Sequence, residues 1–310
     1  MTREYRTAAA FKQALEQHLR LASASGTDFA RRRQLLVFDR FLARVTQELD
    51  DAVMLKGGLA VELRLERART TKDVDLRVMG SPDNILDRLR AAAGRDLGDF
   101  MVFTVRADHR HPDIQNDGMS YDGLRFRAEC SLAGKIYGRP FGVDVAFGDP
   151  ILGEPQSIEA ENTLGFAGAS PSTFRVYPVE THIAEKLHAY TMPRKRPNSR
   201  VKDLPDLALI ATAGSIAAGR LRAAIEQTFS FRGTHDVPGR LPEPPEAWAA
   251  PYATIAKEDH LPWATLGEAF DASRSFLDPM LAGPGDEVWD PNAWAWTATS
   301  PAPGSNPKHG

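Results

Sequence analysis

The stretch 52–78 changes its hydrophobic pattern twice, and this change restricts the possible folds more than any other feature of the sequence. AVMLKGG at 52–58 is a short apolar run that ends in two glycines, which is typical of a strand leading into a turn. Residues 59–68 return to helical spacing, and residues 72–78 alternate between apolar and polar side chains, as in a second strand. The sequence therefore predicts strand, turn, helix and strand in direct succession.

The same analysis extends to the rest of the chain. Residues 1–50 are predicted to be helical, with Thr27 or Asp28 capping a helix whose polar face carries arginines, among them Arg40 and Arg44. A further helix is expected at 84–94, followed by strands at 100–108, 123–134 and 139–149. After Pro178 the pattern becomes helical again, with segments at 179–192, 203–213 and 215–229.

These elements define an α+β chain with four regions. We expect N-terminal helices at 1–50 that pack on a mixed α/β core at 51–177, then a helical domain at 178–235. Region 236–310 holds twelve of the 22 prolines and all five tryptophans. This composition favours irregular segments held against a folded surface, with the last ten residues frayed.

Composition and charge exclude several classes of protein. The 42% apolar and 25% charged residues are an ordinary globular balance, which argues against a mainly disordered chain. Apolar runs are too short for a membrane helix, and the charged N-terminus lacks the core of a secretion signal. Cys130 is the single cysteine, so a disulfide framework within the chain is excluded, and we expect it to be buried in a strand. A cytoplasmic location follows as an expectation.

Paired acids after the glycines are the strongest chemical signal. Asp73 and Asp75 stand at i and i+2 of the predicted strand, so both carboxylates project from one face. Two adjacent carboxylates suit a hard cation such as Mg²⁺, which phosphoryl transfer needs. Gly57 and Gly58 at a strand-to-helix turn let the backbone approach an anion. The glycine pair alone or the acid pair alone is a weak signal of this chemistry, whereas the two pairs together are a specific one.

Four further residues could join this chemistry. Asp144 lies in an apolar strand, either as a third metal ligand or as an edge acid facing water. Lys186 lies beside the apolar face of its helix, where it could snorkel to solvent or contact a phosphate. Asp203 is well placed as a helix cap, and Asp203 or Asp206 could instead be a functional acid. His182 and His188 are not spaced as a zinc pair, so they are expected at the surface or in packing.

A local basic segment interrupts a chain of net charge −3. Residues 184–202 hold six Lys or Arg against one Glu, whereas residues 203–310 hold seven against fourteen acids. Such a segment is either a solvated loop or a site for phosphates. The candidate RNA-binding residues are Arg194, Lys195, Arg196, Arg200 and Lys202.

In combination, these features resemble the AbiEii/AbiGii family of nucleotidyltransferase toxins. LKGGLAVELRLERARTTKDVDLRV at 55–78 is similar to the first family motif, AEKLHAY to the lysine motif and RVKDLPDL to the acidic motif. The resemblance covers roughly residues 30–220. Nucleotidyltransferases often have a serine after the first motif glycine, whereas Gly58 and Leu59 stand here, so backbone N–H groups would replace a hydroxyl.

The resemblance implies a nucleotidyltransferase core like that of DNA polymerase β, followed by a helical domain. It implies Mg²⁺ held by Asp73 and Asp75, with Asp144 as a possible third ligand, and an NTP substrate. It also implies that Lys56, Gly57, Gly58 and Lys186 bind the nucleotide, and that Asp203 acts beside Lys186. A tRNA 3′ end is the implied acceptor, and a cognate antitoxin is the implied partner. Two alternatives stay open, namely a protein or small-molecule acceptor and an inactive nucleotide-binding relative.

Overall fold

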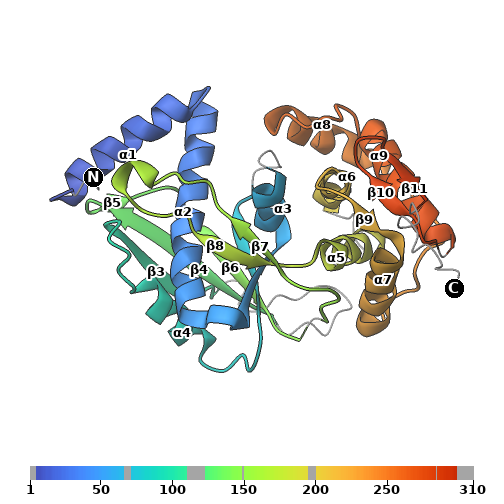
Figure 1. The fold of residues 1–310 in the computed structure, drawn as a ribbon, viewed down its shortest axis with the longest axis horizontal. Helices are drawn as coiled ribbons and strands as arrows, with labels where there is room; N and C mark the ends of the chain where they lie inside the picture. Colours follow the sequence, from blue (N-terminus) through green and yellow to red (C-terminus); the bar gives the residue numbers. More distant parts are fainter. Residues whose placement is uncertain are drawn as a thin grey trace, which may run out of the picture. The chain divides into compact units, whose positions relative to one another are not determined.

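The chain divides into two units, Met1–Pro178 and Val179–Gly310, which are described separately. The computed structural model describes residues 5–65, 71–109, 123–148, 150–194, 200–283 and 285–298 (Figure 1). Within these ranges, none of the helices combines the length and the apolar character that crossing a membrane requires.

The described residues of the first unit form four helices. They are α1 (Ala8–Ala22), α2 (Gly26–Leu49), α3 (Gly57–Leu65) and α4 (Ile85–Ala93), with short 3₁₀ turns at Asp50–Ala52 and Gly165–Ala167. The predicted cap of α2 is wrong by two or three residues: Ser25 is the N-cap, and its Oγ accepts the N–H of Asp28 at 3.1 Å. Serine satisfies one of the free N–H groups at a helix start, so α2 begins before Thr27.

A mixed sheet forms the centre of the first unit. Its strands are β1 (Val53–Lys56), β2 (Asp73–Val78), β3 (Met101–Ala107), β4 (Gly123–Leu132), β5 (Lys135–Ile136), β6 (Phe141–Ala146), β7 (Gln156–Glu159) and β8 (Thr173–Val176). Their order is β3-β4-β6-β2-β1-β8-β7, with β5 paired to β4. β2 runs parallel to β6 and β1 runs parallel to β8, whereas the other neighbours are antiparallel.

Alternation along the strands separates a core face from a polar face. Val74, Leu76 and Val78 on β2 are at most 1% exposed, while the intervening residues of the strand point to the other face. α2 runs across the core face (Figure 1), where Phe38 and Phe41 contact Phe141 of β6 with ring centroids 5.0 and 5.3 Å apart. The acids predicted at i and i+2 of β2 thus lie on the face opposite α2.

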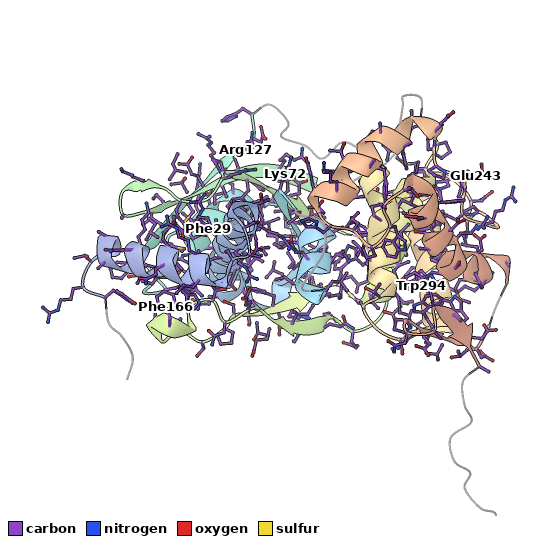
Figure 2. All side chains as sticks on the ribbon, turned by 90° about the horizontal axis from the view of Figure 1, so that it is seen from above. Phe29, Lys72, Arg127, Phe166, Glu243 and Trp294 are labelled. Carbon is purple, nitrogen blue, oxygen red and sulfur yellow. The ribbon has the colours of Figure 1, made fainter. Side chains whose placement is uncertain are left out.

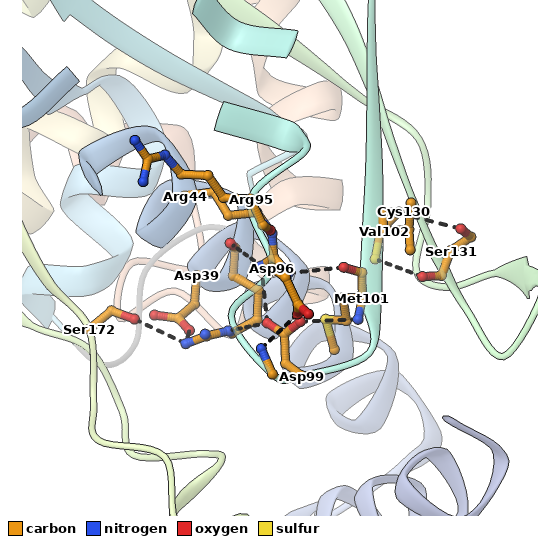
Figure 3. A network of polar contacts seen from close by, with 12 residues as sticks. Asp39, Arg44, Arg95, Asp96, Asp99, Met101, Val102, Cys130, Ser131 and Ser172 are labelled. Carbon is orange, nitrogen blue, oxygen red and sulfur yellow. Dashed lines mark hydrogen bonds and ion pairs between the residues drawn. The ribbon is translucent and has the colours of Figure 1, made fainter. Parts of the chain in front are cut away.

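A buried ion network joins α2 to the start of β3 (Figure 3). The sequence places Arg40 and Arg44 on the polar face of their helix, but both are buried, and Arg44 is fully so. Asp99 accepts from Arg44 Nη2 at 2.6 Å and from Arg40 Nε at 2.8 Å. Burial alone raises the pKa of Asp99, but the two arginines outweigh it and leave that pKa below its ordinary value. The network replaces the solvated surface that the pattern predicted.

Helices dominate the second unit. They are α5 (Val179–Thr191), α6 (Asp203–Ala211), α7 (Ala218–Arg232), α8 (Ala249–Glu258) and α9 (Leu266–Ala282), with 3₁₀ turns at Arg200–Lys202 and Glu246–Trp248. Among the described residues of this unit, the short strands β9 (Ile216–Ala217), β10 (Val288–Asp290) and β11 (Ala295–Thr297) pair in the order β11-β10-β9.

The prediction of irregular structure near the C-terminus is wrong where the chain forms α8, α9, β10 and β11. A capping box starts α9: Thr265 accepts the N–H of Glu268, and the Glu268 side chain accepts the N–H of Thr265. Trp289 is fully buried and donates to the carbonyl of Ala211 at 2.7 Å. Trp294, which Figure 2 labels, packs against Trp289 with ring centroids 5.2 Å apart. The tryptophans thus help to form a core. Residues 301–310 lie outside the described part of the chain.

Candidate functional site

The predicted carboxylate pair is formed by β2. Asp73 is exposed and Asp75 is half-buried, and both lie on the polar face of the sheet. In the parallel pairing with β6, Asp73 is opposite Gly142 and Asp75 is opposite Asp144. Three acids are therefore placed on one face of two neighbouring strands, as the sequence predicted for Asp73 and Asp75.

Two glycines make room for these carboxylates. Gly57 begins α3 with φ +69°, and a Cβ atom there would overlap Oδ2 of Asp75. At Gly142 a Cβ atom would lie 2.6 Å from Oδ1 of Asp73, to which the Gly142 N–H donates at 3.2 Å. Glycine is needed at Gly57 for the positive φ and at both positions for the close approach.

Lys56 is placed beside the pair on the adjacent strand. It is the register partner of Asp75 and is 8% exposed. Its Nζ lies 5.1 Å from the centre of the Tyr177 ring, a cation–π contact. A buried ammonium thus lies next to the carboxylates and the start of α3, where it suits a bound anion.

Asp144 is held by an arginine that the sequence analysis did not single out. Arg125 of β4 donates from Nε to Oδ1 at 2.7 Å and from Nη2 to Oδ2 at 2.6 Å. β6 lies between β4 and β2, so the alternative of an acid at the sheet edge is wrong. The alternating pattern of GLRFRAEC at 123–130 was a usable signal, because it places Arg125 on the polar face.

The donor set fits a hard divalent cation. Carboxylate oxygens are the ligands that Mg²⁺ prefers, and it usually takes only one or two from the protein and keeps water. Asp73 and Asp75 meet that requirement. Within the described residues, no three His, Cys, Asp or Glu side chains gather as a metal site. Metal binding by these acids, and a third ligand from Asp144, therefore stay predictions.

Lys186 of α5 is buried in the second unit in contact with two acids of α6. Its Nζ donates to Oδ2 of Asp206 at 2.6 Å and lies 3.7 Å from Oδ1 of Asp203. Lys186 is only 8% exposed, so the alternative that its ammonium group extends into solvent is wrong. The sequence left open whether Asp203 or Asp206 is the functional acid. In the structure the two differ, because Asp206 accepts a hydrogen bond from Lys186 at 2.6 Å and Asp203 lies farther from that lysine.

The predicted capping role of Asp203 is wrong. Asp203 is the first residue of α6, its predecessor Lys202 has helical backbone angles, and no side chain caps the helix. The 3₁₀ turn at Arg200–Lys202 continues directly into α6, so Asp203 lies within continuous helical structure and not at a capping position. Asp203 instead lies 3.6 Å from Arg200 and near Lys186, within a charged cluster.

The basic segment is described only in part. Arg194 and Arg200 are partly buried and Lys202 is exposed, whereas Lys195 and Arg196 lie outside the described residues.

The two histidines of α5, His182 and His188, are 1% and 0% exposed. His188 bonds to Thr234 and packs on Phe229, so of the two readings, packing is the correct one.

Neutralising Asp206 is expected to cost more stability than neutralising Asp203. Asp206→Asn removes a buried charge-assisted hydrogen bond to Lys186, which should lower the free energy of unfolding by roughly 2 kcal/mol. Asp203→Asn, matched in chemistry and three residues away, weakens two longer contacts, to Lys186 at 3.7 Å and to Arg200 at 3.6 Å, and should cost about 1 kcal/mol. Urea denaturation measures both. Equal losses would show that Lys186 does not depend on Asp206.

Comparisons with known proteins relate the chain to one family. The model described as "Nucleotidyl transferase AbiEii toxin, Type IV TA system" matches residues 40–275. The structure is similar to MenT4, a nucleotidyltransferase toxin from Mycobacterium tuberculosis, with 15% identity, a TM-score of 0.56, and 91% of this chain and 92% of that chain covered. JHP933 from Helicobacter pylori has 14% identity and a TM-score of 0.43, with 80% and 93% covered. No curated protein matches in sequence. The likeness to MenT4 confirms the predicted α+β nucleotidyltransferase fold with a helical part.

Proposed function

Because the chain belongs to the AbiEii family of nucleotidyltransferase toxins of type IV toxin–antitoxin systems, we propose that it transfers a nucleotide from an NTP to the 3′ end of tRNA. The modified tRNA could no longer be aminoacylated, so translation would be blocked. A tRNA acceptor places the reaction in the cytoplasm, and membership of a toxin–antitoxin family implies a cognate antitoxin protein.

One observation supports this proposal more than any other: the carboxylate of Asp75 lies against Gly57, the first residue of α3, and Asp73 stands two residues away on the same strand face. The start of an α-helix presents free N–H groups and a partial positive charge to an anion. The carboxylates would hold Mg²⁺, which supplies charge neutralisation and alignment for phosphoryl transfer. Gly57 and Gly58 would donate backbone N–H groups to the triphosphate, and Lys56 would add a nearby positive charge.

We propose the remaining roles for the charged cluster of Lys186, Asp203 and Asp206 in the second unit. Lys186 would balance the charge that develops on the pyrophosphate. Asp206 holds Lys186 in position, which leaves Asp203 as the candidate base. The acceptor hydroxyl then attacks the α-phosphorus and gives its proton to Asp203. The bond from the α-phosphorus to the bridging oxygen breaks, and pyrophosphate leaves with that electron pair.

The basic segment is the proposed contact to the acceptor. Charged side chains that grip phosphates add affinity that falls steeply as salt rises. Neutralising Arg194 and Lys202, together with Lys195 and Arg196, should weaken the use of tRNA and flatten its salt dependence. Arg200 is kept in this variant because it lies 3.6 Å from Asp203. Transfer to a small acceptor should change little, because that reaction needs no phosphate backbone.

A transfer assay tests the proposal. Purified protein and Mg²⁺ are incubated with each α-³²P-labelled NTP, with total tRNA and separately with a protein extract, and Asp75→Ala is run alongside. We expect label on tRNA from the wild type and a loss of at least about 100-fold in the variant, since the metal contributes several kcal/mol. Label on protein alone would overturn the acceptor but keep the chemistry. Full transfer by Asp75→Ala would contradict the metal assignment.

A further inference from the structure

Arg125 lies on the same face of the sheet as the three carboxylates and pairs with one of them. It lies on β4 directly opposite Asp144, and its two nitrogens contact both oxygens of that carboxylate at 2.7 and 2.6 Å. This bidentate geometry is the strongest form of arginine–carboxylate contact. Its side chain is 37% exposed and that of Asp144 is 13% exposed, so solvent screens the pair only in part.

The same guanidinium also acts on the other two acids. The hydrogen bonds with Asp144 raise the pKa of Arg125 most, and the charges of Asp73 and Asp75 raise it further. One row of register partners crosses four strands as Arg125, Asp144, Asp75 and Lys56. Two positive side chains therefore flank two negative ones along this row.

Charge and ligand count both limit how many divalent ions can bind. A site for two metals holds its ions about 3.5–4 Å apart and needs carboxylate oxygens for each of them. Both oxygens of Asp144 already accept from Arg125. The three acids with Arg125 and Lys56 carry a net charge of about −1, so one divalent ion is tolerated and a second would leave a strongly positive cluster.

We infer that Arg125 takes the place of a second divalent cation, so that the nucleotide-free protein binds one ion at Asp73 and Asp75. This inference rests on the metal role proposed above for those two acids. Asp144 then serves to hold Arg125 and is not a metal ligand while the arginine is present. Arg125 is a positioning residue, and removing it releases a third carboxylate.

Counting bound Mn²⁺ tests the inference without nucleotide or RNA. The electron paramagnetic resonance signal of free Mn²⁺ is followed as the ion is added to a known concentration of the full chain. We expect one bound ion per wild-type chain, two for Arg125→Gln, and one again for Arg125→Gln combined with Asp144→Asn. Arg127→Gln is the matched control, because Arg127 lies two residues along the same strand and face and pairs with Asp108. It should leave the count at one.

The wild-type count alone can overturn the inference, whatever the variants do. Two bound ions would show that Asp144 serves as a ligand beside Arg125, and none would show that the pair does not hold a metal. If Arg125→Gln is folded, as judged by circular dichroism, and still binds one ion, Arg125 does not take the place of a second cation. A protein that binds one Mn²⁺ but labels no tRNA would contradict only the proposed acceptor.

Discussion

Replacing Gly57 by alanine is expected to lower kcat/KM for nucleotide transfer by about 100-fold or more. The new methyl group would overlap Oδ2 of Asp75, and the φ of +69° disfavours any residue other than glycine. Either Asp75 or the start of α3 must move, and displacements of about 1 Å at a reacting centre cost this much. Steady-state kinetics on the purified variant measure the loss.

Gly98→Ala separates backbone strain from the contact with Asp75. Gly98 has the same φ of +69°, but a Cβ atom there meets nothing within 4 Å. That variant should lose about 1 kcal/mol of stability and keep its activity. If both variants lost activity alike, the clash with Asp75 would not be the cause.

Asp99→Asn is expected to lower the free energy of unfolding by about 3–5 kcal/mol. The change leaves the charges of Arg40 and Arg44 buried without their carboxylate, and Arg44 is fully buried. Chemical denaturation at neutral pH measures the loss. Asp87→Asn is the matched control, because its partner Arg90 is exposed, and it should change stability by less than about 0.5 kcal/mol. If Asp87→Asn lowered the free energy of unfolding by as much, burial of the Asp99 network would not explain the loss.

Acid should remove the difference between Asp99→Asn and the wild type. Because the pKa of Asp99 is lower in the folded chain than its ordinary value of about 3.9, its stabilisation is complete above that value. It is lost as pH falls through the folded pKa. Burial raises the pKa of neighbouring Asp39, and the charge of Asp99 raises it further, so that group contributes with the opposite sign and more strongly in the wild type. In strong acid both carboxyls are protonated and this difference also disappears. The two unfolding curves should therefore converge in strong acid.

The local part of the site could be predicted from the sequence because its signals lie close together in the chain. The glycine pair and the spacing of Asp73 and Asp75 specify a turn, a helix start and one strand face, and the structure has all three. The family follows from the same residues, and the match over 40–275 confirms it.

Interactions between distant residues were not predictable in this way. Nothing near Asp144 shows that Arg125 will pair with it, because the pairing depends on the register of β4 and β6. The burial of Arg40 and Arg44 depends in the same way on Asp99, far along the chain. The proline-rich composition also led to a prediction of irregular structure where α8 and α9 form. Contacts such as that of Phe276 in α9 with Trp289 exist only in the folded unit.

The pairing of β9 with β10 determines when the second unit can be completed during synthesis. β9 lies between α6 and α7, yet its partner begins at Val288, and Trp289 fills the space beside Ala211. A ribosome makes the chain from its N-terminus, so the first unit can fold while these residues are still untranslated. The C-terminal end of α6 and strand β9 thus lack their partners until Val288 and Trp289 have been made. A chain that stalls earlier would carry an unfinished second unit, which makes it a target for proteolysis.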